Sequence, residues 1–281
     1  MDMNIVWSAL VLSFKKHGKW WYYAAQKLPI DPYKDLLLLF DFLYRFDVIS
    51  TKGVLISEIQ QRYQAYYSRN VSHPIYGATI DMLYRRKVGF DHIKDFLQSD
   101  LLYVSRVAYH TEDELKAYIC DRGVSISMII WQILWCAPWW YWYLQALWEW
   151  CWIVHMLYDF HKDITGWYYY IPQEILDRFG VSHDDIVWSM RMHRTCWSLQ
   201  NLVKYYCDIH ERLFAYALDG LWYTNPSLHQ SILELFASYE HKIWWLRSNN
   251  YNIFHPSIQS SVLWAIKAYF IYWLWYLWSR K

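Results

Sequence analysis

Three side chains that can hold a metal ion recur at four-residue steps before Pro172. They are His155, Asp159 and Asp163, and in a helix this spacing places them on one face, about one turn apart. Mg²⁺ prefers hard oxygen ligands and commonly bridges a few protein carboxylates to the phosphates of a substrate. The spacing therefore indicates a candidate site for divalent cations and a phosphorylated ligand.

The same aspartates have a simpler interpretation as part of a solvated helix face, because His161 and Lys162 lie beside them. Charged faces of this kind are far commoner than metal sites. A transition-metal site is the weakest interpretation, because His161 is expected to point away from the face that carries His155 and Asp159. Spacing alone leaves these alternatives open.

A magnesium site would suit the departure of a diphosphate group. Carboxylates do not stabilise a diphosphate directly, so the cation must lie between them. Loss of the diphosphate leaves an allylic carbocation, and apolar or aromatic walls exclude the water that would quench it. Such chemistry needs an apolar helical cavity with acidic groups at its mouth.

The elements that would position these residues are helices. The chain has only 8 Gly and 7 Pro, and apolar residues between them recur mostly at helical spacing. A helix is expected over residues 35–49, after a loop that contains Pro29 and Pro32. Strand signals are poor, because no Asn-Gly or Asp-Gly hairpin turn lies between alternating runs and the β-branched residues are scattered. The pattern predicts an all-α bundle.

Two capping patterns predict where further helices begin. A helix should begin at Thr111, whose side chain can cap the backbone N–H of Glu114, and run towards Leu134. Ser182 begins a similar pattern, which predicts one helix that carries residues 187–207.

Composition limits the function classes. The 281 residues contain no Gly/Ser/Pro-rich linker, which predicts a single domain over residues 1–281. The 27 Lys and Arg and 26 Asp and Glu are dispersed, so no nucleic-acid partner is expected. The five cysteines form no C-x-x-C pair and the N-terminus lacks signal-peptide features, so a cytoplasmic protein is expected.

Tryptophan and tyrosine are unusually frequent, with 21 and 27 residues. Two explanations compete: an interfacial membrane protein, and a sequence redesigned onto an existing backbone, which the spread of Trp along the whole chain favours. The apolar segments 128–154 and 262–278 are long enough to span a membrane. Polar residues within the first segment favour buried bundle helices, and peripheral membrane contact stays open.

The stretch from His155 to residue 182 resembles the second aspartate-rich motif of the squalene/phytoene synthase family. Asp159 and Asp163 match the two aspartates of that motif. Residues 170–172 match its Tyr-hydrophobic-Pro loop, and residues 178–181 match the Arg-Phe-Gly-Val sequence that follows. The resemblance implies an all-α, single-domain isoprenoid-synthase bundle around a central apolar cavity.

Other similar segments follow in the family's order across most of the chain. They are the opening residues 1–4, residues 15–19 and 28–29, residues 111–118, Tyr239, and residues 250–251. The opening segments are most similar to those of the bacterial dehydrosqualene synthases.

The resemblance implies a Mg²⁺-dependent prenyltransferase that condenses two farnesyl diphosphates head to head. The product would be dehydrosqualene, or squalene where a reductant is used; no G-x-G-x-x-G sequence is present, so the use of NADPH stays open. The implied metal ligands are Asp47, Asp159 and Asp163, with Tyr239 as a further catalytic residue. The implied substrate-binding residues are His17, Lys19, Arg45, His155 and Tyr251.

Several positions depart from the family pattern. The first acidic motif keeps only Asp47 of its acids. In the second motif the expected Asn, Arg and upstream Gln are His155, Tyr158 and Trp152, and a later Arg is Pro256. Loss of two arginines removes charge-assisted hydrogen bonds worth about 1.5–3 kcal/mol each. These departures support a second hypothesis, an inactive or redesigned scaffold with the same fold; a membrane-inserted helical protein is a third, weaker one.

Overall fold

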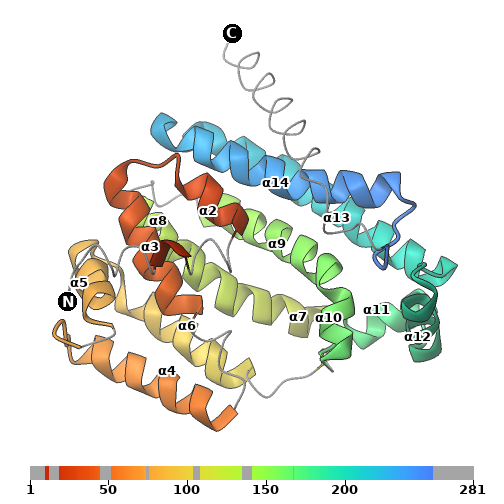
Figure 1. Ribbon diagram of the computed structural model, residues 1–281, viewed down its shortest axis with the longest axis horizontal. Helices are drawn as coiled ribbons and strands as arrows, with labels where there is room; N and C mark the ends of the chain where they lie inside the picture. Colours follow the sequence, from red (N-terminus) through yellow and green to blue (C-terminus); the bar gives the residue numbers. More distant parts are fainter. Residues whose placement is uncertain are drawn as a thin grey trace. The chain divides into compact units, whose positions relative to one another are not determined.

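Helices make up the regular secondary structure of the part that the computed structural model describes, apart from an isolated bridge between Ala108 and Tyr169 (Figure 1). The described residues are 10–12, 19–44, 52–73, 76–103, 108–134, 141–166 and 168–255. Their contacts form two compact units: residues 1–105, 121–141 and 223–232 make the first, and residues 106–120, 142–222 and 233–281 the second. The predicted all-α class is confirmed, and the single domain stays a prediction.

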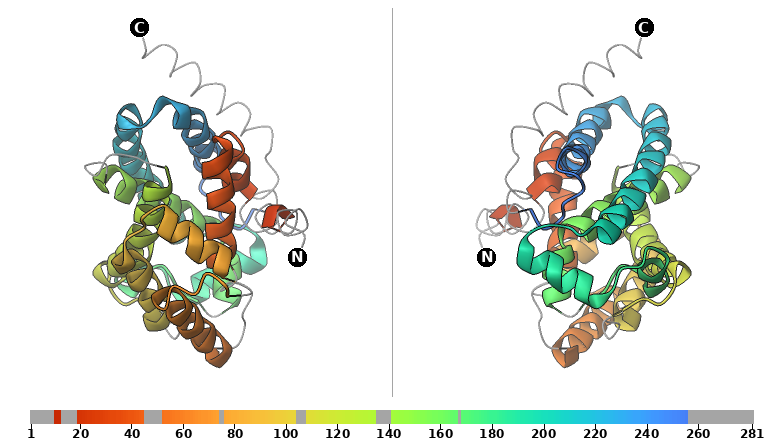
Figure 2. Two further views of the ribbon diagram at one scale, coloured as in Figure 1. Left: turned by 90° about the vertical axis from the view of Figure 1, so that its left-hand side faces the viewer. Right: turned by 90° about the vertical axis from the view of Figure 1, so that its right-hand side faces the viewer.

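The first unit is a group of packed helices. They are α2 (Lys19–Ala25), α3 (Ile30–Tyr44), α4 (Lys52–Tyr67), α5 (Gly77–Arg85), α6 (Phe90–Tyr103) and α8 (Ser125–Leu134). Figure 1 shows α6 between α4 and α8, and it packs on both. The red helix α3 packs on the orange helix α5, beside which it lies in Figure 2. Leu39, Ile59, Ile80 and Ile129 are fully buried and form part of this core.

A buried arginine joins two of these helices. Arg62 of α4 is fully buried, and burial of a charge is unfavourable unless the charge is paired. Its guanidinium donates to the carboxylate of Glu58 at 3.1 Å and to the backbone carbonyl of Phe42 in α3. It also lies over the rings of Phe42 and Tyr76, and the Tyr76 hydroxyl donates to Glu58. The ion pair between Arg62 and Glu58 is therefore surrounded by aromatic rings and by hydrogen-bond partners.

The second unit carries the aspartates. It contains α7 (Glu112–Ile119), α10 (Phe160–Thr165), α11 (Gln173–Arg178), α12 (His183–Met192), α13 (Trp197–Gly220), and most of α9 (Tyr141–Tyr158) and α14 (His229–Ser248). Fully buried Trp150 of α9 lies 5.5 Å from the ring of Phe214 in α13 and 5.3 Å from that of Phe236 in α14. These three helices therefore share one aromatic core.

The end of α13 approaches α9 closely. A Cβ atom placed on Gly220 would lie 2.5 Å from the side chain of Tyr143. No real side chain fits at that distance, so this contact requires glycine.

Both predicted helix starts are confirmed. The Thr111 hydroxyl accepts from the N–H of Glu114 at 3.1 Å, although the Glu114 carboxylate accepts from the N–H of His110 rather than of Thr111. Ser182 and Asp185 make the full reciprocal pair, at 3.1 Å and 2.9 Å. The second cap is thus the more complete of the two.

The helix predicted from Thr111 towards Leu134 is continuous over 112–134, but the π-helical segment Cys120–Val124 separates α7 from α8. One other predicted helix extent is wrong. Residues 187–207 do not form one helix, because α12 ends at Met192 and α13 begins at Trp197. His193 adopts the left-handed conformation with φ 50° and ends α12. Histidine tolerates this conformation more often than most residues do, but no glycine or proline marks the break in the sequence.

The helix predicted over residues 35–49 begins earlier, at Ile30, and is confirmed as far as Tyr44. Residues 45–49 lie outside the described residues, as does the apolar segment 262–278. Of the helices within the described ranges, none has the length and apolar character needed to cross a membrane.

The Ser182 cap offers a direct test of this fold. We expect Ser182→Ala to lower the free energy of unfolding by about 1 kcal/mol, because the N–H of Asp185 loses its partner at an exposed helix start. Ser182→Gly is the matched variant and should lower the free energy of unfolding by only a few tenths of 1 kcal/mol. Urea denaturation followed by circular dichroism measures both, and equal stability of the wild type and Ser182→Ala would contradict the cap.

Candidate functional site

The central site residues lie where α9 meets α10. Asp159 stands between the two helices with φ −89° and ψ −1°. The backbone hydrogen bonds continue through this junction: the N–H of Asp159 donates to His155 and the N–H of Asp163 donates to Asp159, both at 2.8 Å. The structure therefore keeps His155, Asp159 and Asp163 at nearly helical spacing, although the helix bends between them.

His155 connects the aspartates to α14. Its Nε2 atom lies 2.7 Å from the hydroxyl of Tyr239, which is buried. Its Nδ1 atom lies 3.9 Å from Oδ2 of Asp159, too far for a hydrogen bond, so this attraction acts through charge when the imidazole is protonated. The side chains of His155 and Asp159 are 48% and 46% exposed. A buried tyrosine thus anchors a histidine beside a solvent-accessible carboxylate.

The two carboxylates differ in their tendency to bind a proton. Burial and the negative charge of Asp159 raise the pKa of Asp163 to about 6. Burial also acts to raise the pKa of Asp159, but His155, Lys162 and Lys242 together outweigh it and lower that pKa. The ionised pair is therefore repulsive at neutral pH, and a cation beside it would relieve the repulsion.

This donor set fits Mg²⁺ in part. The two carboxylates supply hard oxygen atoms, and Mg²⁺ usually completes its shell with water and substrate phosphate oxygens. Among the residues with described positions, no three His, Cys, Asp or Glu side chains converge as a complete metal site. A metal held here would therefore depend on its substrate or on further ligands.

Lys242 is a cation in this site that the sequence analysis missed. Its Nζ atom lies 4.8 Å from the ring centre of Tyr158 and 5.3 Å from that of Tyr239. The Tyr158 hydroxyl donates to the backbone carbonyl of Lys242 at 2.9 Å. Burial lowers the pKa of Lys242 to about 8, and the charge of Asp159 partly offsets the effect.

The signal that could have identified Lys242 is its position three residues after Tyr239 on α14, since residues at that spacing share a helix face. Tyr158, which replaces the arginine of the family pattern, packs against it.

The remaining candidate residues are not brought to this site by the described structure. Tyr251 lies in the turn after α14 with φ 55°, and its electrostatic neighbours are Cys207, Arg247, Asp208 and Glu211. Lys19 is the first residue of α2, and nothing is described of its side chain. His17, Arg45 and Asp47 lie outside the described residues.

Segments that carry the family resemblance pack on one another in the second unit. The carboxylate of Glu112 accepts from the Tyr205 hydroxyl at 3.0 Å and from Arg178 at 3.5 Å, and the Glu112 N–H donates to Glu174. The helix after Thr111 is thereby connected to the Arg-Phe-Gly-Val segment. These contacts connect α7, α11 and α13 within the second unit.

A second set of contacts is aromatic. The ring of Tyr170, in the Tyr-Ile-Pro loop, lies 5.3 Å from Trp152 and 6.3 Å from Tyr118. Trp152 occupies the position of the family's upstream glutamine, so an aromatic contact replaces a polar side chain there.

Comparison with known proteins gives a structural match and no sequence match. No protein-family profile and no curated protein sequence matches this chain. A dehydrosqualene synthase solved in complex with a ligand is 16% identical with a TM-score of 0.81, and 93% of each chain is covered. Squalene synthase HpnC from Alicyclobacillus acidocaldarius is 14% identical with a TM-score of 0.76, over 88% of this chain and 94% of that one.

A third solved structure agrees. YisP from Bacillus subtilis subsp. subtilis strain 168 is 11% identical with a TM-score of 0.69, over 95% of each chain. A structural likeness at identities this low shows the fold alone. The chain therefore has the squalene/phytoene synthase fold, as its sequence motifs predict.

Proposed function

We propose that this chain is a Mg²⁺-dependent prenyltransferase that condenses two farnesyl diphosphates head to head. The observation that carries the proposal is the meeting of a carboxylate pair, a histidine and a lysine at the α9–α10 junction and α14. That grouping occurs in a chain with the fold of squalene and dehydrosqualene synthases.

Each residue of the group has a separate role in this proposal. Asp159 and Asp163 would hold the metal, and Mg²⁺ bound there would supply positive charge that stabilises a departing diphosphate. Lys242 adds a cation beside the same diphosphate. His155, fixed by the Tyr239 hydroxyl, keeps the Asp159 carboxylate ionised and orients the approach of the ligand.

The aromatic side chains would protect the carbocation. Trp150 lies 5.1 Å from the ring of Tyr239, so aromatic faces continue inward from the charged group. Such faces attract cations and exclude water. The product would be dehydrosqualene, or squalene where NADPH or another reductant takes part.

Turnover tests the proposal. Purified full-length chain incubated with labelled farnesyl diphosphate and Mg²⁺ should give a cyclopropyl diphosphate or a hydrocarbon with twice the farnesyl skeleton; a parallel reaction with NADPH distinguishes the reduced product. Asp159→Asn and Asp163→Asn should each lower kcat/KM by about 100-fold or more, because the metal loses an anionic ligand. Product analysis by chromatography measures the effect.

The matched control is Asp219→Asn, an exposed carboxylate near the end of α13 that makes no contact in this site. It should keep full activity. No product from folded helical chain would contradict the proposal and support the inactive scaffold instead.

The pH dependence of ligand binding tests Lys242. Burial lowers the pKa of Lys242 to about 8, so its ammonium group becomes a neutral amine at higher pH. Affinity for a farnesyl diphosphate analogue with Mg²⁺ should therefore fall as pH rises through about 8. Lys242→Gln should bind about 10–100-fold more weakly below that pH, because a charge-assisted contact is lost. Isothermal titration calorimetry across this pH range measures both.

Lys242→Arg is the charge-preserving control, since a guanidinium stays protonated throughout. It should bind the analogue without the loss near pH 8. Identical pH profiles for the wild type and Lys242→Arg would rule out the assigned role.

A further inference from the structure

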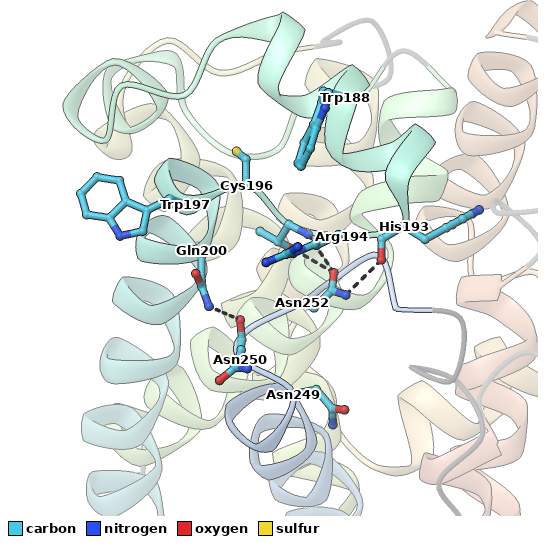
Figure 3. Close-up of a pocket in the computed structure, with 10 residues that line it drawn as sticks. Trp188, His193, Arg194, Cys196, Trp197, Gln200, Asn249, Asn250 and Asn252 are labelled. Atoms are coloured by element: carbon cyan, nitrogen blue, oxygen red, sulfur yellow. Dashed lines mark hydrogen bonds between the residues drawn. The ribbon is translucent and has the colours of Figure 1, made fainter.

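A cavity of about 780 Å³ opens in the second unit where α12 turns into α13 (Figure 3). The turn after α14 closes its other side. The lining residues are Trp188, His193, Arg194, Thr195, Cys196, Trp197, Gln200, Asn249, Asn250 and Asn252. The aspartates of the candidate site are not among them, so this surface has a separate role.

Large apolar side chains are exposed around this cavity. Trp188 and Met192, one turn apart on α12, are 46% and 58% exposed, and Trp197 at the start of α13 is 77% exposed. Trp188 and Trp197 lie on opposite sides of Cys196 in Figure 3. Exposed apolar groups that cluster commonly mark an interaction site, and the indole group favours the interface between membrane and water.

Two arginines accompany these apolar groups. Arg191 and Arg194 are exposed, and residues 186–207 contain them with Lys204 and no Asp or Glu, although the exposed Asp184 lies one turn before Trp188 on α12. Neither arginine takes part in the ion pairs formed among the described residues. Their charge therefore faces solvent.

Most of the amide groups in the cavity are already used. Asn252 accepts from the N–H and hydroxyl of Thr195, both at 3.0 Å, and donates to the carbonyl of His193 at 3.0 Å. Gln200 donates to the carbonyl of Asn250 at 2.6 Å. These bonds hold the two turns together rather than offering a site for a polar small molecule. The cationic and indole groups remain as the binding elements.

We propose that the surface formed by Trp188, Arg191, Met192, Arg194 and Trp197 docks onto a membrane that contains anionic lipid. The two indoles and Met192 enter the interface, and the arginines contact lipid phosphates. Polybasic surfaces gain membrane affinity with each Lys or Arg near the headgroups, and apolar contact adds to it. The proposal concerns a different surface from the candidate active site and does not depend on catalysis.

Vesicle binding tests this docking surface. The full-length chain should cosediment with phosphatidylcholine vesicles that contain phosphatidylglycerol, and much less with phosphatidylcholine alone. Arg191→Glu/Arg194→Glu should lower the partition coefficient by about 10-fold or more, because two favourable charges become repulsive. Trp188→Ala/Trp197→Ala should lower it by a similar factor, because the interfacial indoles are lost.

The matched control is Trp142→Ala/Arg212→Glu, which changes an exposed Trp and an exposed Arg elsewhere in the second unit. This variant should bind as the wild type does, and circular dichroism should show that all variants keep their helices. Unchanged binding by both surface variants would overturn the proposal, since another part of the chain would then hold the membrane. Aromatic and cationic surfaces can also bind single-stranded DNA. Tighter binding of the wild type to single-stranded DNA than to anionic vesicles would overturn the proposal as well.

Discussion

The packing of α9 against α14 is the constraint on which the candidate site depends. Trp150 fills the interface, and its indole donates to the carboxylate of Glu240 at 3.1 Å. Tyr239, the residue before Glu240 on α14, reaches His155 of α9. The same interface that buries the aromatic core therefore fixes the first member of the charged group, and Asp159 follows one helical turn later. The packing that buries the aromatic core therefore also sets the geometry of the candidate site.

The charge balance of the site differs from the pattern that its motifs suggest. Where the family places an arginine beside the first aspartate, this chain has Tyr158, whose hydroxyl bonds the backbone of Lys242. The lysine brings a positive charge from the other helix, with a pKa lowered by burial. An ammonium is a compact charge on a flexible stem, whereas a guanidinium can bind phosphate through two parallel hydrogen bonds. The exchange keeps the sign of the charge but changes how a diphosphate would be held.

The sequence predicts the helices and the aspartate pair because both have local signals. Thr111 and Ser182 mark helix starts through their own side chains, and the four-residue spacing of Asp159 and Asp163 survives the bend between α9 and α10. The break at His193 and the position of Lys242 escape prediction for different reasons. A left-handed histidine is held by tertiary contacts such as that between Asn252 and its carbonyl, and the contact of Lys242 with Tyr158 joins residues far apart in the chain.

The most direct test of the account is a crystal structure of the full-length chain grown with Mn²⁺ and a thio analogue of farnesyl diphosphate. Anomalous scattering locates the metal independently of the protein trace. We expect a metal peak at the carboxylates of Asp159 and Asp163, with the diphosphate group facing Lys242. A diphosphate bound away from these residues, or carboxylates that contact only water while the analogue is present, would contradict the assignment of this site.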